Sequence, residues 1–355
     1  MTYQRNSIRT ISRRTVLRGA GFGIAAATGV AAGSGPSTKV VAAAQSTTEA
    51  TLALDWYPNA NHAGLYLARE RAYFTATGLE LEIYTPSDPT VVLQTVGSGQ
   101  DTFGISYQTD VLLARAQGVP VVSIAALVQH PLLGIMSLQN QGITRPADLA
   151  GKQVGYPGLP SQEAFLATML EADGASLDDV ELVNVGFDLV PAAISGQLAG
   201  VMGAYWTHET ILAEREGYPV SLLRVEEWGV PDYYELVLTA SESTIAGQSD
   251  LVAAFLRAVT QGYTDAAADP TAALAALAAA SDDVDVEVEE EGIALLIPQW
   301  LDGSTPFGHQ DAARWSAYAA WMAERGLIPA DLDLDGAFVA GLLPAAGTPV
   351  ATPNS

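Results

Sequence analysis

Between residues 51 and 138 the sequence alternates short apolar runs with segments whose apolar residues recur at helical spacing. Strands are expected at 51–55, 80–84, 102–106 and 121–127, and helices at 63–75, 90–98 and 108–117. This order predicts a parallel sheet with right-handed crossover connections. The loops that follow parallel strands emerge at one edge of the sheet, where α/β proteins bind their ligands. These loops are therefore expected to share one cleft.

Three of these loops, at 55–62, 84–88 and 106–110, are rich in polar and aromatic residues. The first of these loops alone offers a carboxylate, an indole, a phenol, two carboxamides and an imidazole. The candidate binding residues in the three loops are Asp55, Trp56, Asn59, His62, Tyr84 and Tyr107. So many hydrogen-bonding and stacking groups exceed what a turn requires, although a solvated turn beside buried aromatic residues is the alternative.

A second unit is expected to begin near Ile143. A strand at 153–156 ends in Tyr156, and the Gly- and Pro-rich loop 157–161 leads into a helix capped by Ser161 and continuing to residue 172. Free N–H groups at the start of this helix suit an acceptor oxygen. The same loop fits an ordinary strand–helix turn equally well, and the sequence does not decide between the two.

Two further polar-aromatic sets flank strands later in this unit. A strand at 201–204 enters the first set, and the second set, at 231–235, precedes a strand at 236–239 that is interpreted as the return crossing to the first unit. The candidate binding residues in these sets are Tyr205, Glu209, Tyr234 and Glu235. A carboxylate such as Glu209 accepts hydrogen bonds from an amino-substituted ring, and Tyr205 can stack on such a ring. An exposed Glu beside buried aromatic residues is the alternative.

The rest of the chain is expected to be mostly helical, with helices at 250–268, 271–280 and 310–326. Aromatic residues three apart in the last of these indicate a core-facing surface. The acidic run at 282–291 is interpreted as a solvated face, with calcium binding as the remote alternative. Residues 345–355 have the composition of a disordered tail.

The N-terminal segment 1–44 has the features of a twin-arginine signal peptide. Arginines at 13 and 14 precede a weakly apolar Gly/Ala run, and small residues stand at 42–44. The segment holds six of the 16 Lys and Arg and none of the 40 Asp and Glu, so its removal leaves 10 against 40, a formal charge of −30. Such a surface repels nucleic acid. Export is expected, with a periplasmic or cell-surface location. Since the chain has no cysteine, disulfides and thiolate sites are excluded.

The chain resembles the type II periplasmic binding proteins of ABC importers, and within them the branch that binds thiamine pyrimidine precursors. The resemblance covers most of residues 51–265 and is carried chiefly by Asp-Trp-Tyr-Pro-Asn at 55–59, Gly-Ala-Tyr-Trp-Thr-His-Glu at 203–209 and Pro-Asp-Tyr-Tyr-Glu at 231–235. It implies an α/β fold with two lobes, a ligand cleft between them and two crossing strands. The expected division is a signal peptide at 1–44, a first lobe at 45–138, a second lobe at 139–237, a return to the first lobe with C-terminal helices at 238–344, and a tail at 345–355.

The resemblance further implies a 4-amino-2-methylpyrimidine ligand, such as its formylated aminomethyl form, captured by lobe closure. Trp56 and a tyrosine, either Tyr205 or Tyr234, would stack on the ring, and a carboxylate such as Asp55 or Glu209 would accept from its amino group. The expected partners are an ABC permease and its ATPase, and the expected state is a monomer without cofactor or metal.

Other ligands in the same fold, riboflavin or an alkyl sulfonate, are the first alternative. The second is a pyrimidine synthase, because eukaryotic enzymes of thiamine biosynthesis share the resemblance. Their pyridoxal-phosphate lysine and substrate histidine correspond here to Ser106 and Asp110. Their iron-linked cysteines have no counterpart either, so no enzymatic activity is expected.

Overall fold

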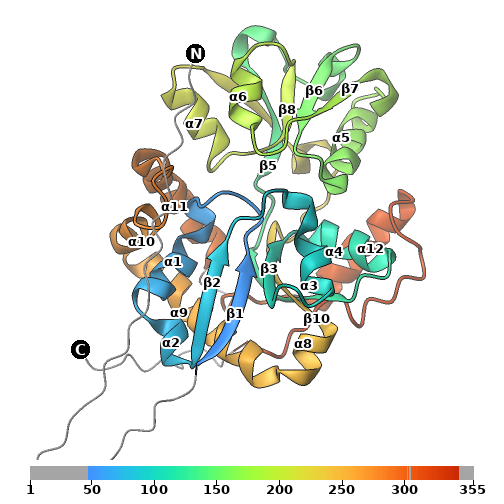
Figure 1. Ribbon diagram of the computed structural model, residues 1–355. Coiled ribbons are helices and arrows are strands. Elements are labelled where there is room, and N and C mark those ends of the chain that lie inside the picture. The colour runs from blue at the N-terminus through green and yellow to red at the C-terminus, as the bar shows by residue number, and fades with distance from the viewer. Residues whose placement is uncertain (1–46, 302, 304, 344–355) are drawn as a thin grey trace, which may run out of the picture. The chain divides into compact units, whose positions relative to one another are not determined.

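The computed structural model describes residues 47–301, 303 and 305–343 (Figure 1). The expected signal peptide at 1–44 and the tail at 345–355 lie outside the described residues. Within the described part, two five-stranded mixed sheets organise the fold. Each sheet corresponds to one of the two expected lobes.

The first sheet has the strand order β2-β1-β3-β10-β4. Strands β1 (Thr48–Ala53), β2 (Leu79–Tyr84) and β3 (Phe103–Ser106) are parallel, as the strand–helix alternation predicts. Strand β10 (Leu236–Ser241) runs antiparallel between β3 and β4 (Val121–Val128). The interpretation of β10 as a return crossing to the first lobe is confirmed.

The second sheet has the order β7-β6-β8-β5-β9. Strands β6 (Gln153–Tyr156), β7 (Glu181–Asn184) and β8 (Gly200–Tyr205) are parallel, and β5 (Leu133–Leu138) pairs antiparallel with β8 and with β9 (Val220–Arg224).

The position of β5 corrects the expected border between the lobes. The sequence placed residues up to 138 in the first lobe, whereas β5 belongs to the second sheet, so the chain crosses between β4 and β5 at 129–132. Strands β4 and β5 are both buried along their whole length, so hydrophobicity does not reveal which sheet each one joins.

Twelve α-helices surround the sheets in the described part of the chain. Those of the first lobe are α1 (Ala63–Glu70), α2 (Tyr73–Ala76), α3 (Val92–Gly97), α4 (Gln108–Ala116), α8 (Glu242–Gly247), α9 (Ser249–Ala268), α10 (Pro270–Ala278), α11 (Val286–Trp300) and α12 (Ala312–Glu324). Those of the second lobe are α5 (Pro160–Ala172), α6 (Leu189–Ile194) and α7 (Glu209–Arg215). Short 3-10 segments lie at η1 (Ala60–His62), η2 (Pro89–Val91), η3 (Gln139–Gln141), η4 (Pro146–Leu149), η5 (Leu177–Asp179) and η6 (Val225–Trp228).

Three local expectations need correction. The helix expected at 63–75 is broken at Ala72, whose φ of 57° is left-handed. Helix α5 begins with Pro160 and is not capped by Ser161, whose hydroxyl donates instead to Asp110 Oδ2 at 2.7 Å. The acidic run at 282–291 is not wholly solvated, because Glu289 is only 1% exposed.

Among residues 47–301, 303 and 305–343, no helix is long and apolar enough to cross a membrane. Within the same residues no cluster of three His, Asp or Glu side chains is placed to hold a metal ion.

Candidate functional site

A small cavity lies where residues of both lobes meet at the ends of β1, β3 and β8. Its lining is made of Asp55, Trp56, Asn59, Tyr107, Gln162, Gly203, Tyr205 and Glu209. Its volume is about 20 Å³, whereas sites for small organic ligands commonly measure about 300–1,000 Å³. A ring-sized ligand therefore requires the lobes or the lining side chains to move apart.

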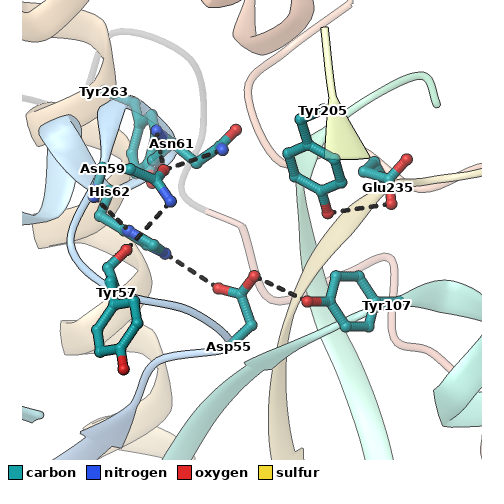
Figure 2. A network of polar contacts seen from close by, with 9 residues as sticks. All are labelled: Asp55, Tyr57, Asn59, Asn61, His62, Tyr107, Tyr205, Glu235 and Tyr263. Atoms are coloured by element: carbon teal, nitrogen blue, oxygen red, sulfur yellow. Dashed lines mark hydrogen bonds and ion pairs between the residues drawn. The ribbon is translucent and has the colours of Figure 1, made fainter. Parts of the chain in front are cut away.

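Asp55 lines the cavity and lies between His62 and Tyr107 (Figure 2). It is buried, and its Oδ2 accepts a hydrogen bond from the Tyr107 hydroxyl at 3.1 Å. Its Oδ1 lies 3.0 Å from Nε2 of the fully buried His62. Because His62 Nδ1 accepts the Asn59 N–H at 3.2 Å, the proton of the neutral ring lies on Nε2 and is donated to Asp55. Both carboxylate oxygens of Asp55 are thus occupied.

The loop that carries Asp55 and Trp56 is held by its own hydrogen bonds. Asn59 caps η1, its Oδ1 accepting the Asn61 N–H at 2.9 Å and its Nδ2 donating to the Tyr57 carbonyl at 3.1 Å. Tyr263 on α9 donates its hydroxyl proton to the Asn61 carbonyl at 2.6 Å. These bonds fix the loop before any ligand arrives.

Tyr205 and Glu209 line the second-lobe side, and Glu235 lies behind Tyr205. Glu209 Oε2 accepts the Tyr205 N–H at 2.8 Å. The Tyr205 hydroxyl donates to Glu235 Oε1 at 3.2 Å (Figure 2). Glu235 Oε2 also accepts from the Leu132 N–H at 2.6 Å and from the Tyr233 hydroxyl at 2.9 Å. Since Leu132 lies in one crossing segment and Glu235 at the start of the other, Glu235 joins the two connections between the lobes.

Burial dominates the electrostatics of these groups. It raises the pKa of Glu235 to about 7, although the hydrogen bonds to that carboxylate act in the opposite direction. Burial also raises the pKa of Glu209, against the effect of neighbouring His208. The pKa values of Tyr107 and Tyr205 lie well above 10 for the same reason, so both remain neutral phenols that donate hydrogen bonds.

His208, beside Glu209, makes an ion pair across the lobes. Its Nδ1 lies 3.1 Å from Glu289 Oε1 on α11, and Glu289 Oε2 accepts the Ala60 N–H at 2.5 Å. Burial alone would lower the pKa of His208, but Glu209, Glu289 and Asp285 outweigh it and raise the value to about 9. At neutral pH the imidazole is therefore a cation.

Six of the eleven residues predicted from the sequence line the cavity, and two more form hydrogen bonds to lining residues. The six are Asp55, Trp56, Asn59, Tyr107, Tyr205 and Glu209. The two supporting residues are His62, bonded to Asp55, and Glu235, bonded to Tyr205.

The remaining three tyrosines do not line the cavity. Tyr84 donates to Asp101 at 2.7 Å, and burial together with that carboxylate raises its pKa to about 12. Tyr156 bonds to Glu163. The ring of Tyr234 is buried beneath the Arg314 guanidinium, whose central carbon lies 4.1 Å from the ring centroid.

Two lining residues were not anticipated from the sequence. Gln162 stands in the first turn of α5, and Gly203 lies within β8 with a φ of +105°. The Gly- and Pro-rich loop 157–161 predicts free N–H groups at the start of α5, but it gives no indication of the Gln162 side chain. Gly203 belongs to one of the quoted motifs, yet a glycine in a strand gives no direct indication of a ligand.

A second, larger groove of about 250 Å³ lies beside this cavity. It is lined by η2, α3, α4 and the residues 158–160, and it includes Ser106 and Asp110. Burial raises the pKa of Asp110 to about 6, with Ser161 acting in the opposite direction. This groove holds few of the aromatic groups that a flat ring requires.

The fold of the chain is shared with solved structures. It matches the alkanesulfonate-binding protein SsuA from Xanthomonas axonopodis pv. citri bound to MOPS, with a TM-score of 0.66 and 16% identity, covering 82% of this chain and 98% of that one. The chain therefore has the two-lobed fold of the periplasmic binding proteins.

Sequence comparison identifies the family. The NMT1/THI5-like family model matches residues 59–273. The formylaminopyrimidine-binding protein of Halalkalibacterium halodurans is 41% identical over 273 residues, which cover 76% of this chain and 83% of that protein. The 4-amino-5-hydroxymethyl-2-methylpyrimidine phosphate synthase of Schizosaccharomyces pombe is 29% identical over 63% of this chain and 67% of that enzyme. The chain belongs to the NMT1/THI5-like family.

Proposed function

We propose that this protein is an exported solute-binding subunit of an ABC importer and that it captures a 4-amino-2-methylpyrimidine, such as formylaminopyrimidine. The observation that carries the proposal is the cavity to which both lobes contribute aromatic and hydrogen-bonding side chains. The 41% identity to a formylaminopyrimidine-binding protein supports the same ligand class.

The lining suits a flat, uncharged heteroaromatic ring. Trp56 supplies an indole that is held against Phe187 of the second lobe, with the ring centroids 4.6 Å apart. Tyr107 and Tyr205 add further aromatic surface, and Glu209 offers acceptor oxygens to an amino group. A micromolar Kd corresponds to about 8 kcal/mol. Stacking supplies roughly 1 kcal/mol per aromatic pair beyond area burial, so ring desolvation and polar contacts must provide the rest.

The same lining argues against the alternative ligands and reactions. The eight residues that form it, all described, include no Lys, Arg or His. A sulfonate would lack a cationic partner there, and a pyridoxal-phosphate lysine is absent from both the cavity and its neighbouring groove. Ser106 and Asp110, which correspond to the two reacting residues of the synthases, line the groove instead. These features favour binding over turnover.

The proposal also includes export by the twin-arginine route, directed by residues 1–44, to a periplasmic or cell-surface location. There the protein is proposed to deliver its ligand to a permease and its ATPase. The protein is proposed to act as a monomer, with residues 47–128 and 236–343 serving the first lobe and residues 133–235 the second. The twin-arginine pattern and the family's binding-protein members support this assignment.

Calorimetric titration of the purified protein with formylaminopyrimidine, hydroxymethylpyrimidine, riboflavin and an alkanesulfonate tests the proposal. One-to-one binding of a pyrimidine, weakened in Trp56→Ala and retained in Tyr84→Phe, is the expected result. The Tyr84 hydroxyl bonds to Asp101 outside the cavity and serves as the matched control. Binding of riboflavin or the sulfonate alone, or conversion of any of these compounds, would refute the assignment.

A further inference from the structure

Gln162 lines the cavity and has a buried side-chain oxygen without a hydrogen-bond partner within the described residues. The residue is 5% exposed, and the atom without a partner is its side-chain Oε1. Leaving a buried acceptor unpaired costs about 1–3 kcal/mol. Because such atoms are rare in native proteins, each calls for a specific explanation.

The neighbouring polar residues of the cavity use most of their hydrogen-bonding atoms within the chain. Asp55 uses both oxygens, toward His62 and Tyr107. Asn59 uses its oxygen for Asn61 and its amide nitrogen for the Tyr57 carbonyl. Glu209 Oε2 accepts a hydrogen bond from the Tyr205 N–H. Among the eight lining residues, Gln162 is thus the one with a buried side-chain atom that lacks a hydrogen-bond partner within the described residues.

Gly203 makes room for this carboxamide. A Cβ at residue 203 would stand 2.2 Å from Gln162 Oε1 and 2.8 Å from Nε2, distances that exclude any side chain without displacing Gln162. The left-handed φ of +105° also favours glycine at this point of β8. The absence of a side chain at residue 203 therefore leaves space for the Gln162 amide group beside the cavity.

We propose that Gln162 is a specificity-determining residue that recognises the exocyclic amino group and adjacent ring nitrogen of the ligand. A carboxamide presents an acceptor and a donor side by side, and in nucleic-acid recognition Asn and Gln use this pair to bind the amino group and ring nitrogen of adenine. A 4-aminopyrimidine offers the same donor–acceptor edge. This inference rests on the proposed function, since it requires a pyrimidine ligand in the cavity.

The test compares two ligands in two proteins. Formylaminopyrimidine and its analogue with methyl in place of the 4-amino group are titrated into wild type and Gln162→Met, which keeps the side-chain length and removes the amide. Wild type should prefer the amino ligand by roughly 10- to 100-fold, the range expected for one buried hydrogen bond. In Gln162→Met the preference should fall by roughly fivefold or more, mainly through weaker binding of the amino ligand, while Glu209 still accepts from the amino group.

A stability readout separates recognition from packing. Without ligand, Gln162→Met should melt at the wild-type temperature or above it, because the substitution removes an unpaired acceptor. Gln310→Met is the matched control, since that buried carboxamide accepts from the Ser123 hydroxyl at 2.6 Å and donates to the Ser123 carbonyl at 3.3 Å. Gln310→Met should lower the melting temperature and leave the ligand preference intact.

The outcomes distinguish the two levels of the argument. If wild type binds neither pyrimidine, the proposed function fails and this inference falls with it. If wild type binds the amino ligand but Gln162→Met keeps the preference, or weakens both ligands equally, the role of Gln162 is overturned and the proposed function stands.

Discussion

The ion pair between His208 and Glu289 makes the stability of the protein depend on pH. It connects the start of α7 in the second lobe to α11 in the first, with 3.1 Å between Nδ1 and Oε1. The charged groups around His208 are Glu209 on α7 and Glu289 and Asp285 from α11 and its cap. In the same interface Arg215 on α7 pairs with Glu287 on α11.

The magnitude follows from the pKa of His208, which rises from 6.5 to about 9 on folding. One pKa unit corresponds to about 1.36 kcal/mol, so the imidazolium contributes about 3 kcal/mol. Because the folded pKa is the higher one, this contribution is complete below about pH 6.5 and is lost as the pH rises through 9. His208→Gln should therefore reduce the free energy of unfolding by about 3 kcal/mol at pH 6 and by much less at pH 10.

Urea unfolding of both proteins at pH 6 and pH 10 measures this difference. Arg215→Gln is the control, because the Arg215–Glu287 pair is largely solvent-exposed and should contribute no more than about 1 kcal/mol. If His208→Gln loses the same stability at both pH values, or loses none at pH 6, the assigned charge of His208 is refuted.

Two further substitutions test the connection between the lobes at Glu235 and the packing of Gly64 against Tyr263. Burial raises the pKa of Glu235 from 4.5 to about 7. As the pH rises from about 4.5 through 7, the wild type should therefore lose about 3 kcal/mol of unfolding free energy relative to Glu235→Gln, measured by urea unfolding. A difference between the two proteins that does not vary with pH would contradict this. Gly64→Ala would place a Cβ 2.5 Å from the Tyr263 ring and should cost about 1–3 kcal/mol, lowering the melting temperature, whereas Gly247→Ala, with open space around it, should change little. Equal effects of the two glycine substitutions would contradict the packing argument.

The strand–helix order of the first lobe was predictable because buried strands and amphipathic helices have distinct hydrophobic periods. Local pattern fails where the decisive factor is remote in sequence. Strand β5 resembles β4 in burial yet pairs with β8 and β9. Strand β9 was not anticipated at all.

The sequence predicts which loops form the site better than it predicts which side chains of those loops line the cavity. Asp55, Trp56 and Glu209 were found because they follow strand ends that converge. Tyr234 shares a motif with Glu235 but packs under Arg314, since neighbouring residues of an extended segment point to opposite sides.

Two other residues depend on three-dimensional detail that no local pattern contains. Glu289 belongs to an acidic run that predicts solvent exposure, yet the Ala60 N–H and His208 hold it inside. Gln162 stands out only because its acceptor lacks a partner in the folded arrangement of the described residues.

A crystal structure of the protein grown with formylaminopyrimidine tests the central claim most directly. The account predicts one pyrimidine between the lobes, against Trp56 and within hydrogen-bonding distance of Glu209 and Gln162. Density for the ligand in the groove beside Asp110, or a ligand-free cavity at saturating concentration, would contradict it.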